Sequence, residues 1–566
     1  MIIFFESLIS NIIILGYGSI LYKSLFKKNT EYKSELFFFG VIILSFLCLI
    51  INIFLPINIY VTLTIFLFGL IFFFNNNHKD NKLFKQIFIS SLLTTILLSF
   101  GKTYDDFGLY HLPTIQKITE SNISLGEANI HFRFGHNFIL FYLIALFKSS
   151  LKNYNLIFIP QALIYSWFII YLVNNLFYKK DYFIKSLCLF LLGIFSIKFY
   201  NYGDHGLDVP VVIFFLIIII YFSQYFIHST GIDKNSNAIF IKILFLSIFL
   251  VTLKISLVLV VFFPLYLFLL YEKRFFKQNL KIFIFIFFLT LVWLSSNILI
   301  SSCIIYPVNL LCLDLPWSPP QSNWNSSVSD VYMEVSAWSK GWIDSLPDRG
   351  KNFDWSYISF IKSVTTFLNS NWYLVWFNGH FIKKIFPFIL SLILIYAFLL
   401  IILKKNFDKN LPKYKTIIFL LFIFSFLNLI FWFNTAPLLR FGFSQIILIT
   451  FLITFTIIQF NLNNIKKIKI IIIIFFFIFI ARNINLLKLE NFQRDLLRPY
   501  PSYFSKSVSK KIPNFQSIYL NEDLNLNITN RGECFDISFP CTHFTEIKHS
   551  RLIVDRWFIF KIFKVL

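Results

Sequence analysis

Residues 36–54 read LFFFGVIILSFLCLIINIF, a stretch of almost entirely apolar side chains without a single charge. The hydrocarbon core of a bilayer is about 30 Å thick, and a helix needs about 20 apolar residues to cross it. A helix also satisfies its backbone hydrogen bonds internally, which the membrane interior requires. The stretch therefore predicts a membrane-spanning helix, and the chain repeats this pattern many times.

The composition of the whole chain agrees with a membrane protein. Of its 566 residues, 57% are hydrophobic and 14% are charged, and the mean hydropathy is +0.72. These values exceed what a soluble protein of this size needs. The formal net charge of +23 raises the question of nucleic-acid binding. However, the lysines fall in short loops between apolar runs and form no basic stripe interleaved with aromatic residues, so we exclude that function class.

The apolar runs predict an all-α polytopic protein with about 14 transmembrane helices. We expect spans near residues 3–25, 36–54, 57–76, 86–100, 155–177, 183–199, 209–228, 239–253, 255–271, 281–300, 383–403, 415–433, 444–460 and 467–481. The first of these has no basic segment before it and no small-residue cleavage site, so we interpret it as a span and not as a signal peptide.

Clusters of lysine and arginine predict which loops are cytoplasmic. The clusters are Lys23/Lys27/Lys28/Lys33, Lys79/Lys82/Lys85, Lys179/Lys180/Lys185, Lys273/Arg274/Lys277, Lys404/Lys405/Lys409/Lys413 and Lys466/Lys467/Lys469. All six lie on one side only if the shorter apolar run 134–148 does not cross the membrane. We therefore expect that run to be juxtamembrane, which leaves Lys148 and Lys152 outside together with both chain termini.

This topology sorts the polar segments onto the non-cytoplasmic face, at 101–133, 201–208, 301–382, 434–443 and the tail from 482. The inside loops are short and basic. We expect additional N-terminal helices over 1–85, a transmembrane core over 86–481 that includes the outer loop 301–382, and an exoplasmic tail over 482–566.

The first outer segment begins GKTYDDFGLYHLP and places Asp105 and Asp106 at the membrane surface, followed by Tyr110 and His111. Such carboxylates could act as a general base toward a hydroxyl acceptor or help to hold a divalent metal ion. Two solvated loop acids are the simpler interpretation, since adjacent acids specify no particular reaction.

The second outer segment, NYGDHGLDVP, carries Asp204, His205 and Asp208 directly before an apolar run. Asp208 is well placed to cap the following helix, a role that does not exclude a functional one.

Two cations interrupt or begin apolar runs. Lys254, in TLKISL, divides an apolar stretch of about thirty residues into two short helices that meet outside, and an ammonium group there suits a phosphate. Arg440, in NTAPLLRFGF, stands at the head of a later span, where its planar group could grip a phosphate in two places. A lysine that snorkels at a helix end and an arginine in an ion pair are the structural alternatives.

Cysteine and tryptophan are concentrated in the outer segments. Cys303 with Cys312 and Cys534 with Cys541 fit structural disulfides in an oxidising compartment. The 301–382 loop holds seven of the 11 tryptophans, which we assign mainly to an interfacial belt or a small loop core, although indoles also suit sugar rings. His111, His131, His136 and His205 leave room for a divalent metal ion, but their spacing is not diagnostic.

The order of these elements resembles the GT-C superfamily of membrane glycosyltransferases, which includes aminoarabinose transferases, protein O-mannosyltransferases and the RgtA/B/C/D-like group. YDDFGLYHLP followed by FGHNFILFYLIALF is similar to the first exoplasmic loop of that superfamily, LDVP to its Asp-x-Pro element, and TLKIS to its lysine-containing helix break. The IYPVNLLCLDLPW stretch and the Cys-bearing tail are similar to a branch of bacterial multi-pass proteins with such a core.

The resemblance, which covers roughly residues 86–480, implies an inverting sugar transfer from a polyprenyl-phosphate donor to a cell-envelope glycan or lipid acceptor, on the non-cytoplasmic face of the bacterial inner membrane. Carried over by position, Asp105 or Asp106 is the catalytic acid/base, Asp208 a secondary acid, and Lys254 a phosphate contact. Three extra spans before the core and the absence of a large loop domain depart from the pattern and leave the acceptor open.

The sequence also fits other function classes. A transporter or flippase for a lipid-linked glycan would place ionisable groups along a path through the membrane, whereas a transferase would gather them at one face. A polysaccharide polymerase or ligase would share the donor class, and a purely structural scaffold would need no site. No P-loop, GxGxxG, HExxH or GxSxG motif points to another chemistry.

Overall fold

The structure is a computed structural model of the whole chain. It describes residues 2–26, 32–77, 80–99, 107–151, 157–178, 181–197, 206–228, 234–270, 273–318, 328–347, 357–406, 411–460, 462, 464–490, 515–521, 524–529, 541–543, 552–557 and 560–565.

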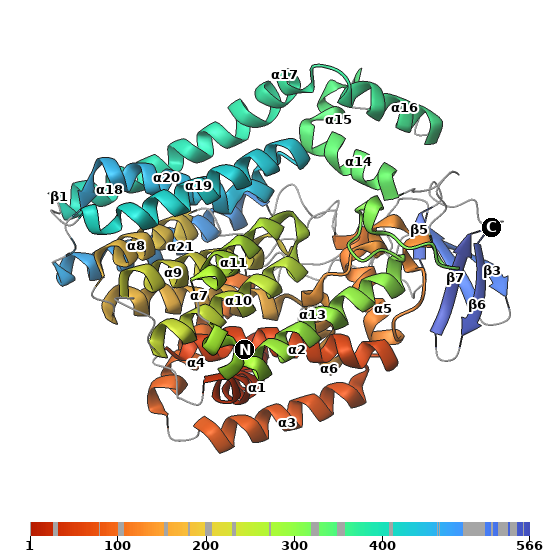
Figure 1. Cartoon of the computed structure of the whole chain (residues 1–566), viewed down its shortest axis with the longest axis horizontal. Coiled ribbons are helices and arrows are strands. Elements are labelled where there is room, and N and C mark those ends of the chain that lie inside the picture. The colour runs from red at the N-terminus through yellow and green to blue at the C-terminus, as the bar shows by residue number, and fades with distance from the viewer. Residues whose placement is uncertain are drawn as a thin grey trace.

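Most of the chain forms one bundle of roughly parallel and antiparallel helices (Figure 1). Ten described helical segments are long and apolar enough to cross a membrane, so the chain is a multi-pass membrane protein. They are α1 (Ile2–Phe26), α2 (Lys33–Phe54), α3 (Ile59–Asn77), α7 (Ile159–Tyr178), α9 (Asp208–His228), α10 (Lys234–Leu253), α13 (Leu280–Ser301), the continuous segment α17 (Trp372–Trp376), η8 (Phe377–Ile385) and α18 (Phe386–Leu403), α19 (Leu411–Thr435) and α20 (Leu439–Ile457).

The other expected spans coincide with four further helical segments. These are α4 (Asn81–Ser99), α8 (Tyr182–Ile197), η5 (Ile255–Val261) with α11 (Phe262–Leu269), and α21 (Ile465–Glu490). The η5 segment is a 3₁₀ helix, which rises about 2 Å per residue where an α-helix rises about 1.5 Å. Leu257 inside η5 has non-helical dihedrals (φ −102°, ψ 21°), so a kink divides this stretch.

The described parts of the six basic clusters come together at one end of the bundle, which we call the β1–β2 end after its two short paired strands, β1 (Lys405–Asn406) and β2 (Gln459–Phe460). Four contacts each join segments beside two different clusters: Lys33 pairs with Asp80 at 2.6 Å, Lys82 lies over the Tyr178 ring, the Tyr414 hydroxyl donates to Asp181, and Tyr182 donates to the Phe460 carbonyl. The remaining cluster, in α12 (Lys273–Gln278), is reached through α10: Phe275 contacts Phe240, and Lys242 pairs with Glu35 beside the first cluster.

The opposite end carries the first outer segment. We call it the disulfide end, after the Cys303–Cys312 bond that follows α13 there. It contains η1 (Phe107–His111), α5 (Leu112–Glu120), η2 (Glu127–Asn129), η3 (Phe132–Gly135) and α6 (Ile139–Leu151). Asn137, just before α6, donates to Ser296 and Asn297 near the end of α13, while the Leu146 carbonyl accepts from Thr62 near the start of α3. Asn137 and Leu146 thus both contact helix ends at the disulfide end, and the juxtamembrane position of 134–148 stays a prediction.

The N-terminal helices share the core of the bundle. One hydrophobic cluster runs from Ile13 to Phe479. The Asn11 side chain in α1 donates to Ser90 and Ser91 in α4 and accepts from the Trp167 indole in α7. Helices 1–85 therefore pack as part of the same body as the helices that follow.

Beyond the outer end of α17 stands an arm of three short helices, α14 (Val328–Lys340), α15 (Trp342–Ser345) and α16 (Tyr357–Leu368) (Figure 1). A small core of its own, formed by Ala337, Trp342, Val364 and Phe367, holds the arm together. Trp342 therefore takes the loop-core role expected for part of the tryptophan set, whereas Trp324 and Trp355 lie outside the described residues.

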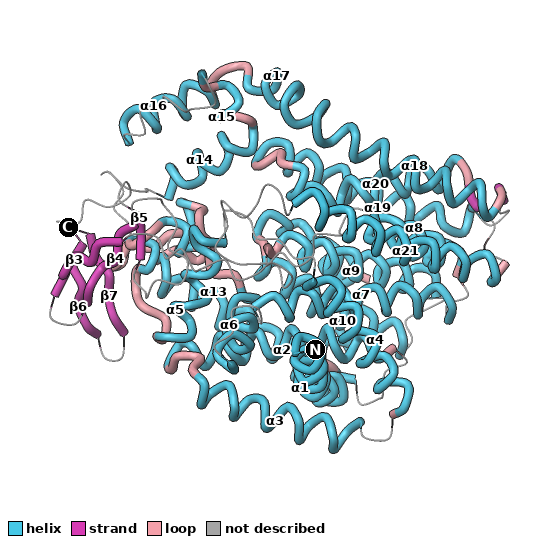
Figure 2. Tube along the Cα trace, turned by 180° about the vertical axis from the view of Figure 1, so that it is seen from behind, coloured by secondary structure: helices cyan, strands magenta, loops and turns pink. Residues whose placement is uncertain are grey.

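The C-terminal tail contains β-strands, which the sequence analysis did not predict. They are β3 (Phe515–Asn521), β4 (Leu524–Thr529), β5 (Cys541–His543), β6 (Leu552–Trp557) and β7 (Phe560–Val565). Strands β3, β4 and β5 form one sheet, and β6 pairs antiparallel with β7. Figure 2 shows the strands gathered at the disulfide end, beyond α5 and α13.

Strand β7 docks on the first outer segment. Leu125 forms a parallel bridge with Ile562, through hydrogen bonds from the Leu125 amide to Lys561 at 2.7 Å and from the Phe563 amide to Leu125 at 2.9 Å. The Asn129 side chain donates to the carbonyls of Phe563 and Trp317. The tail thus joins two outer segments that are far apart in the sequence.

Candidate functional site

An ion pair between Asp208 and Lys254 forms the centre of the candidate site. Asp208 is the first residue of α9, and Lys254 follows the last residue of α10. A carboxylate at a helix N-terminus and an ammonium at a helix C-terminus each complement the local helix dipole. The side chains are 28% and 17% exposed, so the pair is partly desolvated but still reachable from solvent.

The helix break expected at Lys254 is present. Its backbone is extended (φ −160°, ψ 110°) between α10 and η5, and its amide still donates to the Leu250 carbonyl. The break turns the chain at the disulfide end, so that the ammonium group points across to α9 and not along its own helix.

Arg440 joins this pair from a third helix. It is the second residue of α20, and its Nε atom lies 3.9 Å from the second carboxylate oxygen of Asp208. Its side chain is 49% exposed, which leaves the guanidinium group at the open side of the cluster. Lys254 and Arg440 therefore place two positive charges around one carboxylate.

The short turn before Arg440 is held by two indoles. Trp376 of α17 donates to the Pro437 carbonyl at 2.7 Å, and Trp432 of α19 donates to the Leu438 carbonyl at 2.8 Å. Leu438 is extended and precedes the first residue of α20. These two hydrogen bonds fix the point at which α20 begins, and so the position of Arg440.

The Phe441 ring makes cation–π contacts with both Lys254 and Arg440. The Lys254 ammonium lies 3.7 Å from the centre of its ring, and the Arg440 guanidinium lies 5.0 Å from it. A ring face attracts a cation, so Phe441 helps to retain the two charges at the membrane surface.

The first outer segment brings His111 to the cluster. His111 is buried at the end of η1 and interacts electrostatically with the Asp208 carboxylate. Its ring makes edge contacts with Tyr110 and Phe141, and Arg133 lies 5.4 Å from the centre of the Tyr110 ring. The structure thus gathers His111, Asp208, Lys254 and Arg440, with Tyr110 adjacent to them.

Four other residues singled out in the sequence lie outside the described part of the chain. Asp105 and Asp106 directly precede Phe107, the first residue of η1, and Asp204 and His205 directly precede the described Gly206. In sequence, the first pair therefore borders the segment that carries His111, and the second pair borders the one that carries Asp208.

A buried ion pair fixes the first outer segment itself. Lys117 of α5 pairs with Glu127 of η2, and Glu127 also accepts from the Ser124 amide at 2.6 Å. Burial lowers the pKa of the Lys117 ammonium group, and the Glu127 carboxylate opposes that shift. This pair ties α5, which follows His111 directly, to the turn that receives the tail.

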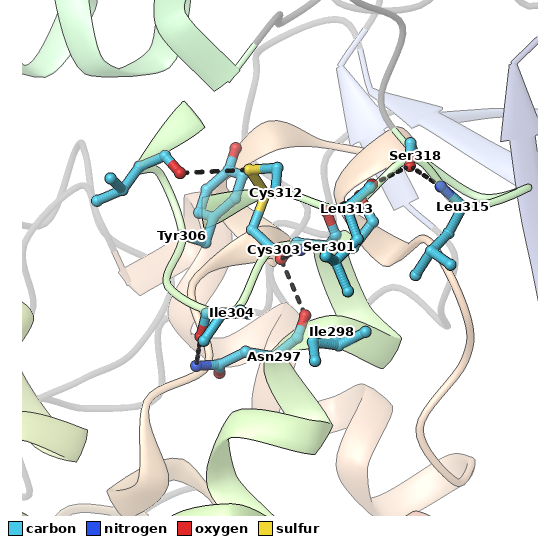
Figure 3. The surroundings of a disulfide bond; sticks show 12 residues. Asn297, Ile298, Ser301, Cys303, Ile304, Tyr306, Cys312, Leu313, Leu315 and Ser318 are labelled. Atoms are coloured by element: carbon cyan, nitrogen blue, oxygen red, sulfur yellow. Dashed lines mark hydrogen bonds between the residues drawn. A yellow bond between two sulfur atoms is a disulfide. The ribbon is translucent and has the colours of Figure 1, made fainter. Parts of the chain in front are cut away.

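Two cysteines of the 301–382 loop form a disulfide, Cys303–Cys312, at the end of α13 (Figure 3). Around it, Asn297 donates to the Ile304 carbonyl and Ser301 donates to the Asn297 carbonyl. Cys541 in the tail is also disulfide-bonded, and its expected partner Cys534 lies outside the described residues. The remaining cysteines, Cys48 and Cys188, are buried free thiols.

No group of three or more histidine, cysteine or acidic side chains gathers as a metal-ligand set within the described ranges. His131 accepts from the Arg133 amide, and His136 stacks on Phe138. These contacts give both rings structural neighbours. The described donor set does not fit a divalent metal ion, and we derive no step through one.

Sequence reasoning missed three contributors to the site. Phe441 follows Arg440 directly, and that adjacency was the available signal for the cation–aromatic contact. Trp376 was grouped with the other tryptophans of its loop, although its indole reaches a turn 61 residues later. The Lys117–Glu127 pair left no signal, because its spacing matches that of many unrelated charges.

Chemically, the arrangement suits an anion held at the membrane surface. The two positive charges of Lys254 and Arg440 outnumber the single negative charge of Asp208. A further cation, Arg133, lies close to the neighbouring Tyr110. Ammonium and guanidinium groups are the usual protein donors to phosphate oxygens.

Comparison with known proteins adds the family of the chain. No curated protein and no solved structure matches it. One family matches residues 1–447, which include the N-terminal helices and the Asp208–Lys254–Arg440 cluster and exclude the tail. The chain therefore belongs to the family described as "Domain of unknown function (DUF8201)".

Proposed function

We propose that the protein is a membrane glycosyltransferase that moves a sugar from a polyprenyl-phosphate donor to a glycan or lipid acceptor of the cell envelope. The observation that carries the proposal is the convergence of Asp208, Lys254 and Arg440 from three helices at one end of the bundle. A transferase gathers its charged groups at one face, and this cluster has the excess of positive charge that a lipid-phosphate leaving group needs.

The site would face the non-cytoplasmic side of a bacterial inner membrane. The six basic clusters gather at the opposite end, as the distribution of positive charge between cytoplasmic and outer loops requires. The Cys303–Cys312 disulfide lies at the same end as the charged cluster and suits an oxidising compartment.

In the proposed reaction, an acceptor hydroxyl attacks the anomeric carbon of the donor sugar, and the bond from that carbon to the phosphate oxygen breaks. The hydroxyl proton passes to Asp105 or Asp106, and the electron pair of the broken bond leaves with the lipid phosphate. Lys254 and Arg440 would stabilise the charge that develops on the phosphate, and Asp208 would hold both cations in place.

The test is sugar transfer by membranes from a radiolabelled polyprenyl-phosphate sugar pool, at matched expression of each variant. We expect Asp105→Asn/Asp106→Asn and Arg440→Gln each to lower transfer, on the order of a hundredfold for the loss of a charge-stabilising group. Lys362→Gln, which removes an exposed cation from α16, is the matched control and should transfer like the wild type. Equal transfer by all variants would remove the assignment.

A second candidate function, transport of a lipid-linked glycan, is favoured by one observation. Glu35 of α2 pairs with Lys242 of α10 at 2.7 Å inside the bundle and accepts from the Tyr221 hydroxyl at 2.8 Å. Ionisable groups within spans often mark a transport path. If the protein is a transporter, Lys242→Met should abolish the movement of a labelled lipid-linked glycan across vesicle membranes. If it is a glycosyltransferase, sugar transfer should persist in a folded Lys242→Met/Glu35→Gln variant.

A further inference from the structure

The outward face of α14 has the opposite polarity from that of a helix in water. Its exposed positions are Tyr332, Val335 and Trp338, which are 48%, 39% and 44% exposed. The buried positions on the same helix are Ser336, Ser339 and Lys340 together with Val328, Val331 and Ala337. A helix that exposes an apolar, mostly aromatic stripe and buries polar side chains among its apolar ones fits an environment less polar than water.

The same polarity continues along the helix to which the arm is attached. Tyr373, Leu374 and Phe377 are exposed at its outer end, and Phe386, Leu390 and Leu394 are exposed farther down, within the span. The continuous segment Trp372–Leu403 has 32 residues and reaches roughly 45 Å, well beyond a hydrocarbon core of about 30 Å. Its outer part therefore extends through the headgroup layer with its apolar stripe still exposed.

The arm is fastened to this outer part. The Lys340 ammonium lies 4.5 Å from the centre of the Trp372 ring, and the Trp342 indole donates to Ser363 at 3.0 Å. Three lysines are also exposed on neighbouring elements, Lys362 on α16 and Lys383 and Lys384 on η8. Exposed aromatic rings together with lysines are the usual composition of a protein surface at the level of lipid headgroups.

We propose that the face formed by Tyr332, Val335, Trp338 and Tyr373 rests on the phospholipid surface at the disulfide end of the bundle. The lipid is its occupant because Tyr373 lies on the same continuous segment as the exposed stripe of the candidate span α18, and Lys340 of α14 contacts Trp372 directly before it. This contact holds the arm at the membrane surface beside Trp376, whose indole fixes the turn before Arg440. The inference does not depend on the reaction proposed above.

The test uses single engineered cysteines that carry an environment-sensitive fluorophore, in vesicles of phosphatidylcholine and phosphatidylglycerol. Trp338→Cys reports on the arm, Ser517→Cys, exposed on strand β3 of the tail, is the water reference, and Leu394→Cys, in the span, is the lipid reference. We expect blue-shifted emission at Trp338→Cys relative to Ser517→Cys, and several-fold stronger quenching by lipids that carry a nitroxide near the headgroup.

Emission and quenching at Trp338→Cys equal to those at Ser517→Cys would overturn the proposal. Protection from aqueous iodide without quenching by the nitroxide lipids would also overturn it and would identify a protein surface as the occupant. Tyr332→Cys and Tyr373→Cys repeat the measurement on two elements, so a folding defect in one variant leaves the test intact.

Discussion

Asp208 and Lys254 stabilise each other at the surface of the bundle, and removing one partner leaves the other partly buried and uncompensated. We expect Lys254→Met to lower the free energy of unfolding by about 1–2 kcal/mol, below the full cost of a buried pair because both side chains retain solvent contact. Thermal unfolding in detergent micelles checks the value. The double variant Asp208→Asn/Lys254→Met should recover part of the loss, and no recovery would contradict the pairing.

His136 makes stability depend on pH. Burial, together with the nearby charges of Arg133 and His131, lowers the pKa of His136 from 6.5 to about 4. The folded protein therefore binds fewer protons than the unfolded chain between these values, so the contribution is complete above pH 6.5 and falls as the pH drops toward 4. His136→Phe should flatten this part of the profile of unfolding temperature against pH. A parallel profile for both proteins would contradict the assignment.

The charged residues of the site were predictable one by one, but their contacts with each other were not. Asp208, Lys254 and Arg440 each stood out because a charge beside an apolar run is rare. Their contact with one another could not be predicted, because it depends on how α9, α10 and α20 pack and not on their spacing in the chain.

At the scale of elements, α1, α2 and α3 approach so closely that glycine is required at their contacts. A Cβ atom on Gly18 would lie 1.7 Å from the Leu36 carbonyl oxygen, and one on Gly16 would lie 2.1 Å from the Gly69 oxygen. Small residues allow such approach between membrane helices. We expect Gly18→Ala to destabilise the protein by about 2–5 kcal/mol, measured by thermal unfolding.

Gly379 provides the matched control for this change. A Cβ atom there would have its nearest neighbour at 3.4 Å, an ordinary contact with the Asp344 carboxylate. Gly379→Ala should therefore unfold close to the wild-type temperature. Similar losses for both glycines would show that close helix approach is not the cause.

The spans were predictable as elements because each one is a local apolar run whose backbone hydrogen bonds are all made within the helix. Their limits were less predictable. The span expected at 383–403 belongs to a helix that begins at Trp372, since polar residues such as Asn378 and His380 can lie at headgroup depth without ending it. In the tail, β3 pairs with β4 and β6 with β7 as local antiparallel hairpins, whereas the bridge from β7 to Leu125 joins residues far apart in the sequence and left no local pattern.

At the scale of the whole molecule, Asn129 connects three parts of the chain. Its side chain donates to Phe563 at 2.8 Å and to Trp317 at 3.0 Å. Asn129→Ala removes both hydrogen bonds, so we expect a loss of about 1–3 kcal/mol in tail docking. Limited proteolysis should then cleave the tail several-fold faster than in the wild type, while Asn378→Ala, at an exposed site, should leave the rate unchanged. An unchanged rate for Asn129→Ala would show that the bridge at Leu125 suffices.

The bridge between Leu125 and Ile562 also sets an order of assembly. Leu125 leaves the ribosome early, whereas its partner strand β7 (Phe560–Val565) follows much later in the chain. The first outer segment must therefore wait, with one edge unpaired, until β7 has been synthesised and has reached the same side of the membrane. A tag placed directly after β7 would meet the docking surface at the moment when the fold closes.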